Sequence, residues 1–104
     1  MFGYYRLASA VPQLRIADVD YNVDRLIAGF REAFEKQAAA VVFPELSITG
    51  YSCGDLFFQP RLRQAALEGL RRFTEATEKS GTVAIVGLPF LYGDALYNTA
   101  AVVQ

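Results

Sequence analysis

The chain has 104 residues, which suffices for one small domain with a single hydrophobic core. Hydrophobic residues make up 53% of it and charged residues 20%, a composition typical of a folded protein and not of a disordered one. The net charge of −1 offers no attraction to nucleic acid or to an anionic membrane, and no apolar run is long enough to span one.

The first half of the chain predicts a strand, a helix and a second strand. Residues 5–11 form a mostly apolar run that Pro12 ends, as expected of a strand. The apolar positions then repeat at helical spacing to about residues 36–39. The start of this helix is expected at three polar residues that can cap it, Asp18, Asp20 and Asn22. Residues 40–43 are short and continuously apolar, which is typical of a strand covered on both faces.

The second half begins with a long connection over residues 46–59, of a kind that is usually functional or mobile. Pro60 is well placed to begin a second helix, and a serine–glycine pair ends it near residue 80. Two further strands are expected, over residues 82–88 and 96–103. The order βαβαββ predicts an α/β fold with crossover helices. Because the chain stops within an apolar strand, we expect it to be a truncated piece.

Glu45 is the residue that most strongly indicates chemistry. The preceding apolar run and Pro44 place its carboxylate at the C-terminal end of a predicted strand, where open α/β sheets build their sites. We expect it to be held out of water there, which would suit it to moving protons. A solvated glutamate paired with a distant arginine is the plainer alternative. The chain has no histidine, which excludes serine–histidine and cysteine–histidine mechanisms and the usual zinc sites within these residues, so no metal site is expected.

The motif around Glu45 carries a family resemblance. Residues 43–51, Phe-Pro-Glu-Leu-Ser-Ile-Thr-Gly-Tyr, resemble the first catalytic motif of the nitrilase superfamily of carbon–nitrogen hydrolases. Other segments resemble the branch of glutamine-dependent NAD synthetases, namely residues 8–12, 52–57, 86–89 and 97–100. The resemblance implies that residues 1–104 are the N-terminal portion of a nitrilase-type α-β-β-α sandwich and cover well under half of that amidase domain.

The resemblance also implies a glutamate–lysine–cysteine triad. Glu45 matches its glutamate, the general base, whereas the lysine and the cysteine would lie beyond Gln104. Tyr51 matches a tyrosine that lines the glutamine pocket. In such enzymes the cysteine sulfur attacks the side-chain amide of glutamine, ammonia departs, and water releases glutamate from the thioester. The 104-residue piece alone is therefore expected to be inactive.

The partners and cofactors implied by the resemblance lie mostly outside the chain. Ammonia would pass to a missing C-terminal synthetase domain, which uses ATP and Mg to amidate deamido-NAD to NAD. No cofactor site is expected within residues 1–104, since the glycines form no phosphate-binding loop. A cytoplasmic homo-oligomer is expected, because half a sandwich leaves a sheet face uncovered and the single cysteine, Cys53, fits a reducing compartment. Neither nucleic acid nor a membrane is expected as a partner.

Two alternatives stay open. The chain could be the same piece of another nitrilase-type amidase, acting on carbamoyl compounds or aliphatic amides, or a non-catalytic flavodoxin-like binding module, against which the missing phosphate-binding glycines count. Other candidate residues have plainer interpretations: Cys53 as a packing residue, and Asn98 as a partner of nearby backbone. The arginines of the second predicted helix are interpreted as a solvated surface and not as a phosphate site: Arg61, Arg63, Arg71 and Arg72.

Overall fold

The computed structural model describes residues 3–104 and confirms the predicted α/β class, with one mixed sheet of four strands and two α-helices. The strands are β1 (Leu7–Ser9), β2 (Ala40–Val42), β3 (Val83–Tyr92) and β4 (Ala95–Val103). The helices are α1 (Val19–Glu35), α2 (Pro60–Thr77) and a short 3-10 helix, η1 (Gly54–Phe58). The strands lie in the order β1-β2-β3-β4; the first two pairings are parallel and the pairing of β3 with β4 is antiparallel.

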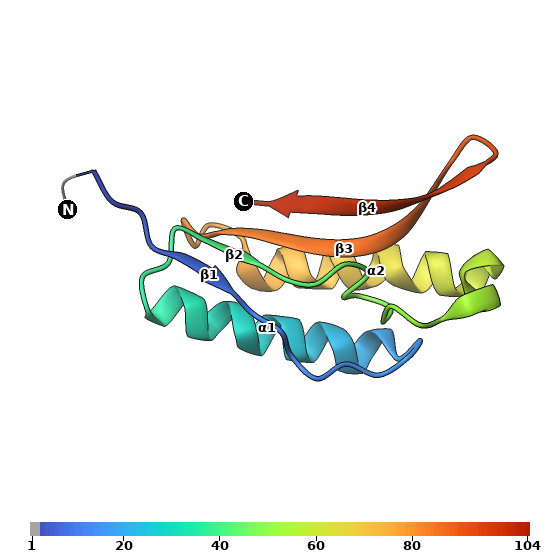
Figure 1. Cartoon of the computed structure of the whole chain (residues 1–104), viewed down its shortest axis with the longest axis horizontal. Coiled ribbons are helices and arrows are strands. Elements are labelled where there is room, and N and C mark those ends of the chain that lie inside the picture. Colours follow the sequence, from blue (N-terminus) through green and yellow to red (C-terminus); the bar gives the residue numbers. More distant parts are fainter. Residues whose placement is uncertain (1–2) are drawn as a thin grey trace.

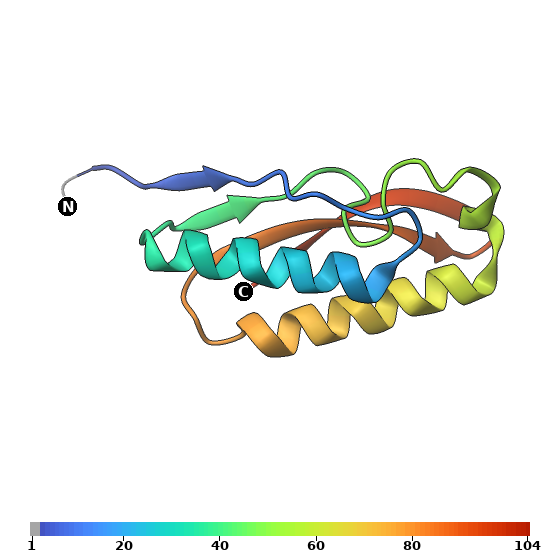
Figure 2. The same ribbon diagram turned by 90° about the horizontal axis from the view of Figure 1, so that it is seen from below.

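Both α-helices cover the same face of the sheet (Figure 1). They lie side by side and run in the same direction, as Figure 2 shows from the helix side. Side chains that point toward the helices enter the core, and a row of paired residues crosses this face: Val41, Ala84 and Val103 are buried, and Ala8 is partly buried. This alternation follows from the two-residue repeat of strands, in which every second side chain enters the core.

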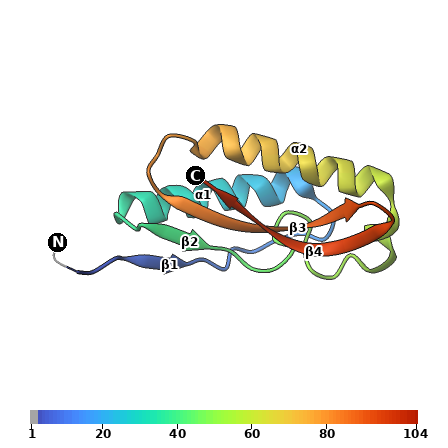
Figure 3. The same cartoon turned by 90° about the horizontal axis from the view of Figure 1, so that it is seen from above.

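Figure 3 shows that no helix or strand of residues 3–104 covers the opposite face of the sheet, which we call the bare face. Apolar side chains are exposed on it. A row of paired residues crosses it, Ser9, Val42, Ile85 and Val102. Leu7 is 72% exposed and Val102 is 67% exposed. The expectation that residues 40–43 are covered on both faces is therefore wrong for this chain, because Val42 is exposed while Val41 is fully buried.

Three aromatic rings tie the helices to the segment that follows β2. The Phe73 ring of α2 meets the Phe30 ring of α1 edge to face, with centroids 6.1 Å apart, and it meets the Phe43 ring in the same way at 6.1 Å. All three are buried. Such pairs add to the stability that burial alone provides. Because the Phe43 ring is fixed in this way, it anchors the backbone that leads into Glu45.

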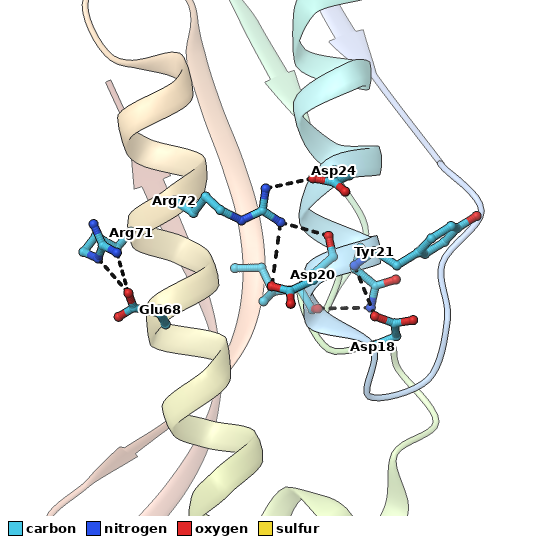
Figure 4. A network of polar contacts seen from close by, with 9 residues as sticks. Asp18, Asp20, Tyr21, Asp24, Glu68, Arg71 and Arg72 are labelled. Carbon is cyan, nitrogen blue, oxygen red and sulfur yellow. Dashed lines mark hydrogen bonds and ion pairs between the residues drawn. The ribbon is translucent and has the colours of Figure 1, made fainter.

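Charged groups also join the two helices at the surface (Figure 4). The guanidinium of Arg72 on α2 donates to Asp24 Oδ1 at 2.8 Å and to the carbonyl oxygen of Asp20 at 2.9 Å, both on α1. Asp18 caps α1 as predicted, since its carboxylate accepts from the Tyr21 N–H at 3.2 Å. No helix of residues 3–104 combines the length and apolar character needed to cross a membrane.

Candidate functional site

Glu45 stands three residues after the end of β2, at the edge of the bare face. Phe43 N–H donates to the Ile85 carbonyl oxygen at 3.0 Å, which carries the β2–β3 ladder one step beyond the strand. The Glu45 side chain then reaches past β3 to β4, where Asn98 Nδ2 donates to its Oε2 at 3.3 Å. The loop after β2 and strand β4 therefore meet at this carboxylate.

Glu45 and Asn98 line an open groove of about 310 Å³ on the bare face. Its other lining residues are uncharged: Val42, Phe43, Pro44, Ile85, Val86, Gly87, Thr99 and Ala100. Among these described residues Glu45 is the sole ionisable group, so no cation neutralises it within the groove. The alternative of a structural ion pair with a distant arginine finds no support in residues 3–104, whose salt bridges involve other carboxylates.

The expectation that Glu45 is held out of water is wrong for this chain. Its side chain is exposed, because the groove opens on the face that the helices leave bare. The carboxylate nevertheless does not extend away from the sheet, since it contacts Asn98 on β4. The position predicted for Glu45 at the sheet edge is thus observed without the predicted burial.

The absence of a side chain at Gly87 brings the Glu45 backbone close to β3. A Cβ atom at Gly87 would lie 2.3 Å from the Leu46 nitrogen and 3.0 Å from the Glu45 carbonyl carbon, closer than packed atoms allow. Gly87 N–H donates to Ser47 Oγ at 3.1 Å, and Ile48 N–H donates to the Gly87 carbonyl oxygen at 3.0 Å. Leu46 itself has a φ of 51°, a left-handed conformation that costs energy in a residue other than glycine. Two hydrogen bonds to Gly87 hold this turn in place.

Asn22 holds the other side of the same loop. Its side chain is fully buried within α1, where Oδ1 accepts from Arg15 N–H at 2.7 Å and Nδ2 donates to the Arg15 carbonyl oxygen at 2.8 Å. Nδ2 also donates to the Ile48 carbonyl oxygen at 3.1 Å. The prediction that Asn22 caps the helix is therefore wrong. Asn22 instead joins the β1–α1 connection to the Glu45 loop. Ile48 is held from both sides, by Asn22 and by Gly87.

Asn98 is the site residue that sequence reasoning missed. We expected its side chain to bond to nearby backbone, and the structure places it on the Glu45 carboxylate instead. The two residues are 53 positions apart, and only the register of the β3–β4 hairpin brings them together. A polar residue on an otherwise apolar row of a predicted strand was the available signal, since Ala100 and Val102 share its face.

Tyr51, the second predicted site residue, lies outside the groove. It is 67% exposed and is not among the residues that line the groove beside Glu45. Cys53 is buried in the core, and its thiol donates to the Thr49 carbonyl oxygen at 3.2 Å, so its interpretation as a packing residue is confirmed.

Two of the four arginines of α2, Arg71 and Arg72, pair with carboxylates, whereas Arg63 donates to the Phe57 carbonyl oxygen at 3.1 Å. Arg71 forms ion pairs with Glu68 and Glu75. Figure 4 shows the pair with Glu68 and the contact of Arg72 with Asp24 on α1. The hydrogen bond from Arg71 and then its positive charge lower the pKa of Glu68. These pairs are exposed, so each stabilises the fold only slightly. Their charges are balanced, which agrees with a solvated surface and not with a phosphate site.

The class of protein follows from this fold and from the glutamate after β2. The model of the carbon-nitrogen hydrolase family matches residues 6–104, and the chain belongs to that family. The strand order also excludes a flavodoxin-like module, in which β1 would lie between β2 and β3.

Within the family the chain is similar to glutamine-dependent NAD synthetases. It is 38% identical over 102 residues to the glutamine-dependent NAD(+) synthetase of Xanthomonas campestris pv. campestris, a match that covers 95% of this chain and 18% of that protein. The crystal structure of a glutamine-dependent NAD(+) synthetase from Cytophaga hutchinsonii superposes with a TM-score of 0.90 at 26% identity, over 96% of this chain and 17% of that one. The chain thus spans less than a fifth of the length of these relatives.

A second kind of relative is an amidase. The structure of a variant of the Nesterenkonia AN1 amidase, from the nitrilase superfamily, superposes with a TM-score of 0.71 at 25% identity. The match covers 92% of this chain and 37% of the amidase. The fold of this chain therefore recurs in proteins of different length.

Proposed function

We propose that residues 1–104 form the N-terminal portion of a glutamine amidohydrolase domain, in a protein that uses the released ammonia to convert deamido-NAD to NAD. The observation that carries the proposal is a single uncompensated carboxylate, Glu45, in a groove on the sheet face that the helices leave bare. Family membership and the 38% identity to a glutamine-dependent NAD(+) synthetase support it. Of the relatives described above, those most similar to this chain are named glutamine-dependent NAD(+) synthetases.

In the proposed mechanism Glu45 is the general base. A cysteine supplied by residues outside this chain loses its thiol proton to Glu45, and its sulfur attacks the amide carbon of glutamine. Glu45 then passes the proton to the departing ammonia, which leaves a thioester. Water attacks the thioester while Glu45 takes a proton from it, and glutamate is released with the thiol restored. A lysine, also from outside the chain, and backbone N–H groups stabilise the oxyanion.

Tyr51 keeps a proposed role in binding glutamine, because the family resemblance matches it to a tyrosine that lines the glutamine pocket. In the structure it is exposed, so this role requires that further parts of the protein form the pocket against it. Replacing the Tyr51 ring would then raise the KM for glutamine more than it lowers kcat.

We infer that ATP and Mg bind outside residues 1–104. The glycines form no phosphate-binding loop, and Arg71 and Arg72 are paired with carboxylates. The proposal therefore assigns ATP-dependent amidation to a synthetase domain outside this chain, which receives ammonia from the amidase domain.

A comparison of amide substrates tests the proposed function. The full-length protein that contains this chain is incubated with glutamine, with an aliphatic amide or with a carbamoyl compound, and ammonia release is measured. We expect release from glutamine, and NAD formation when deamido-NAD and ATP are added. Release from the other amides without use of glutamine would favour the alternative, another nitrilase-type amidase, which the amidase relative supports. The isolated 104-residue chain is expected to release no ammonia from any of them.

A further inference from the structure

We propose that Asn98 is a positioning residue for Glu45, holding one carboxylate oxygen so that the other is free to take the proton. This inference rests on the proposed function. Asn98 Nδ2 donates to Glu45 Oε2 at 3.3 Å, and no group of residues 3–104 donates to Oε1. The amide donor is uncharged, so it orients the carboxylate without forming the ion pair that would weaken it as a base.

The β3–β4 hairpin fixes the position of Asn98. Its register pairs Asn98 with Pro89 and Ala100 with Gly87. Paired residues share a face, and so do residues two apart on a strand. Asn98 therefore lies on the bare face together with Ala100, the partner of Gly87. Asn98 and Glu45 both line the groove described above. Asn98, the hydrogen-bond partner of Glu45, therefore belongs to strand β4 and not to a loop.

Gly87 fixes the position of Glu45 relative to that strand. The Glu45–Leu46 peptide packs directly on Gly87, where a Cβ atom would lie 2.3 Å from the Leu46 nitrogen. Fully buried Ser47 accepts from Gly87 N–H at 3.1 Å and locks the turn. Strand β3 thus positions both Glu45 and Asn98. A displacement of about 1 Å at such a contact can cost roughly a hundredfold in rate.

The closing experiment compares Asn98→Asp and Asn98→Ala with Glu45→Gln in the full-length protein. Asn98→Asp keeps the shape of the side chain but replaces the donor by a negative charge beside Glu45. We expect it to lower kcat for glutamine about tenfold to a hundredfold, and Asn98→Ala to lower it about tenfold, because a hydrogen bond to a charged group is lost in both. The KM for glutamine and the rate with free ammonia should stay within about twofold in each variant.

Tyr97→Phe serves as the matched control, since it removes only a hydroxyl group from the neighbouring residue and should leave kcat unchanged. If Asn98→Asp retains normal kcat while Glu45→Gln is inactive with glutamine, the role of Asn98 is refuted and the proposed function stands. If the Asn98 variants lose kcat together with glutamine binding and melt at lower temperature, Asn98 is structural and the inference is also refuted. If Glu45→Gln uses glutamine normally, both the inference and the proposed function fail.

Discussion

The position of Glu45 depends on a residue that has no side chain. Gly87 allows the peptide after Glu45 to lie against β3, and its backbone groups bond to Ser47 and Ile48 in the turn that follows. The turn includes Leu46 in a left-handed conformation. Strained backbone of this kind persists only where neighbouring contacts enforce it, and it is concentrated at functional sites. Gly87 and the hydrogen bonds around it are the enforcing contacts here.

Gly87→Ala is therefore expected to displace Glu45. The added Cβ atom meets backbone atoms that cannot rotate away, so the free energy of unfolding should fall by about 1–3 kcal/mol. The kcat for glutamine should fall by roughly a hundredfold, because the base moves relative to its substrate. Urea unfolding and steady-state kinetics on the full-length protein measure the two effects.

Gly29→Ala is the matched control for this change. A Cβ atom there meets a ring carbon of Phe43 at 3.1 Å, and a side chain can shift more readily than backbone. Alanine also favours the helix in which Gly29 lies. We expect a smaller loss of stability and a smaller loss of kcat than in Gly87→Ala. Equal losses in both variants would show that Gly87 has no special relation to Glu45.

Sequence reasoning found Glu45 but not Asn98 or the role of Asn22, and the reason is physical. Glu45 is recognisable because its signal is local: an apolar strand, a proline and then a carboxylate. The contacts of Asn98 and Asn22 join segments 53 and 26 residues apart, and no periodicity encodes them. Such contacts become visible only when the strand register and the helix placement are known.

At the scale of elements, the local sequence predicted the existence of each helix and strand more accurately than the residues at which it ends. Pro60 begins α2 as predicted, because its missing N–H is not needed in the first helical turn. β1 is shorter than expected, since β2 offers partners only for Leu7–Ser9. β3 runs through Pro89 to Tyr92, whereas the prediction ended at residue 88. Its pairing with β2 ends at Ile85, so the proline interrupts no bond on that side.

The α1 helix is joined to the Glu45 loop by Asn22, which gives a prediction about stability. Asn22→Ala leaves the Arg15 N–H and the buried Ile48 carbonyl oxygen without their partner, and the Arg15 carbonyl oxygen keeps only the Asp18 N–H at 3.3 Å. Each such loss costs about 1–3 kcal/mol, so the free energy of unfolding should fall by roughly 2–4 kcal/mol. Arg25→Ala, at an exposed position of the same helix, should change it by less than about 0.5 kcal/mol. Thermal or urea unfolding of both variants checks this, and equal stability would contradict the bridging role of Asn22.

At the scale of the whole molecule, the chain is a helical layer on one face of a sheet whose other face is apolar and bare. Exposed apolar surface of this kind marks a place where something else packs. Glu45 and Asn98 lie on that face, and so does the groove between them. The proposed function uses this arrangement: further parts of the protein would cover the face, exclude water from Glu45 and bring the lysine and the cysteine to it.

The central claim is that Glu45 is the base for amide hydrolysis and has no part in the amidation of deamido-NAD. The most direct measurement is the rate of NAD formation by full-length Glu45→Gln with glutamine or with free ammonia as the nitrogen source. We predict that the rate with glutamine falls by at least about a hundredfold, the effect of losing a general base, while the rate with ammonia is unchanged. A Glu45→Gln protein that uses glutamine at the normal rate, or that loses both activities equally, would contradict the claim.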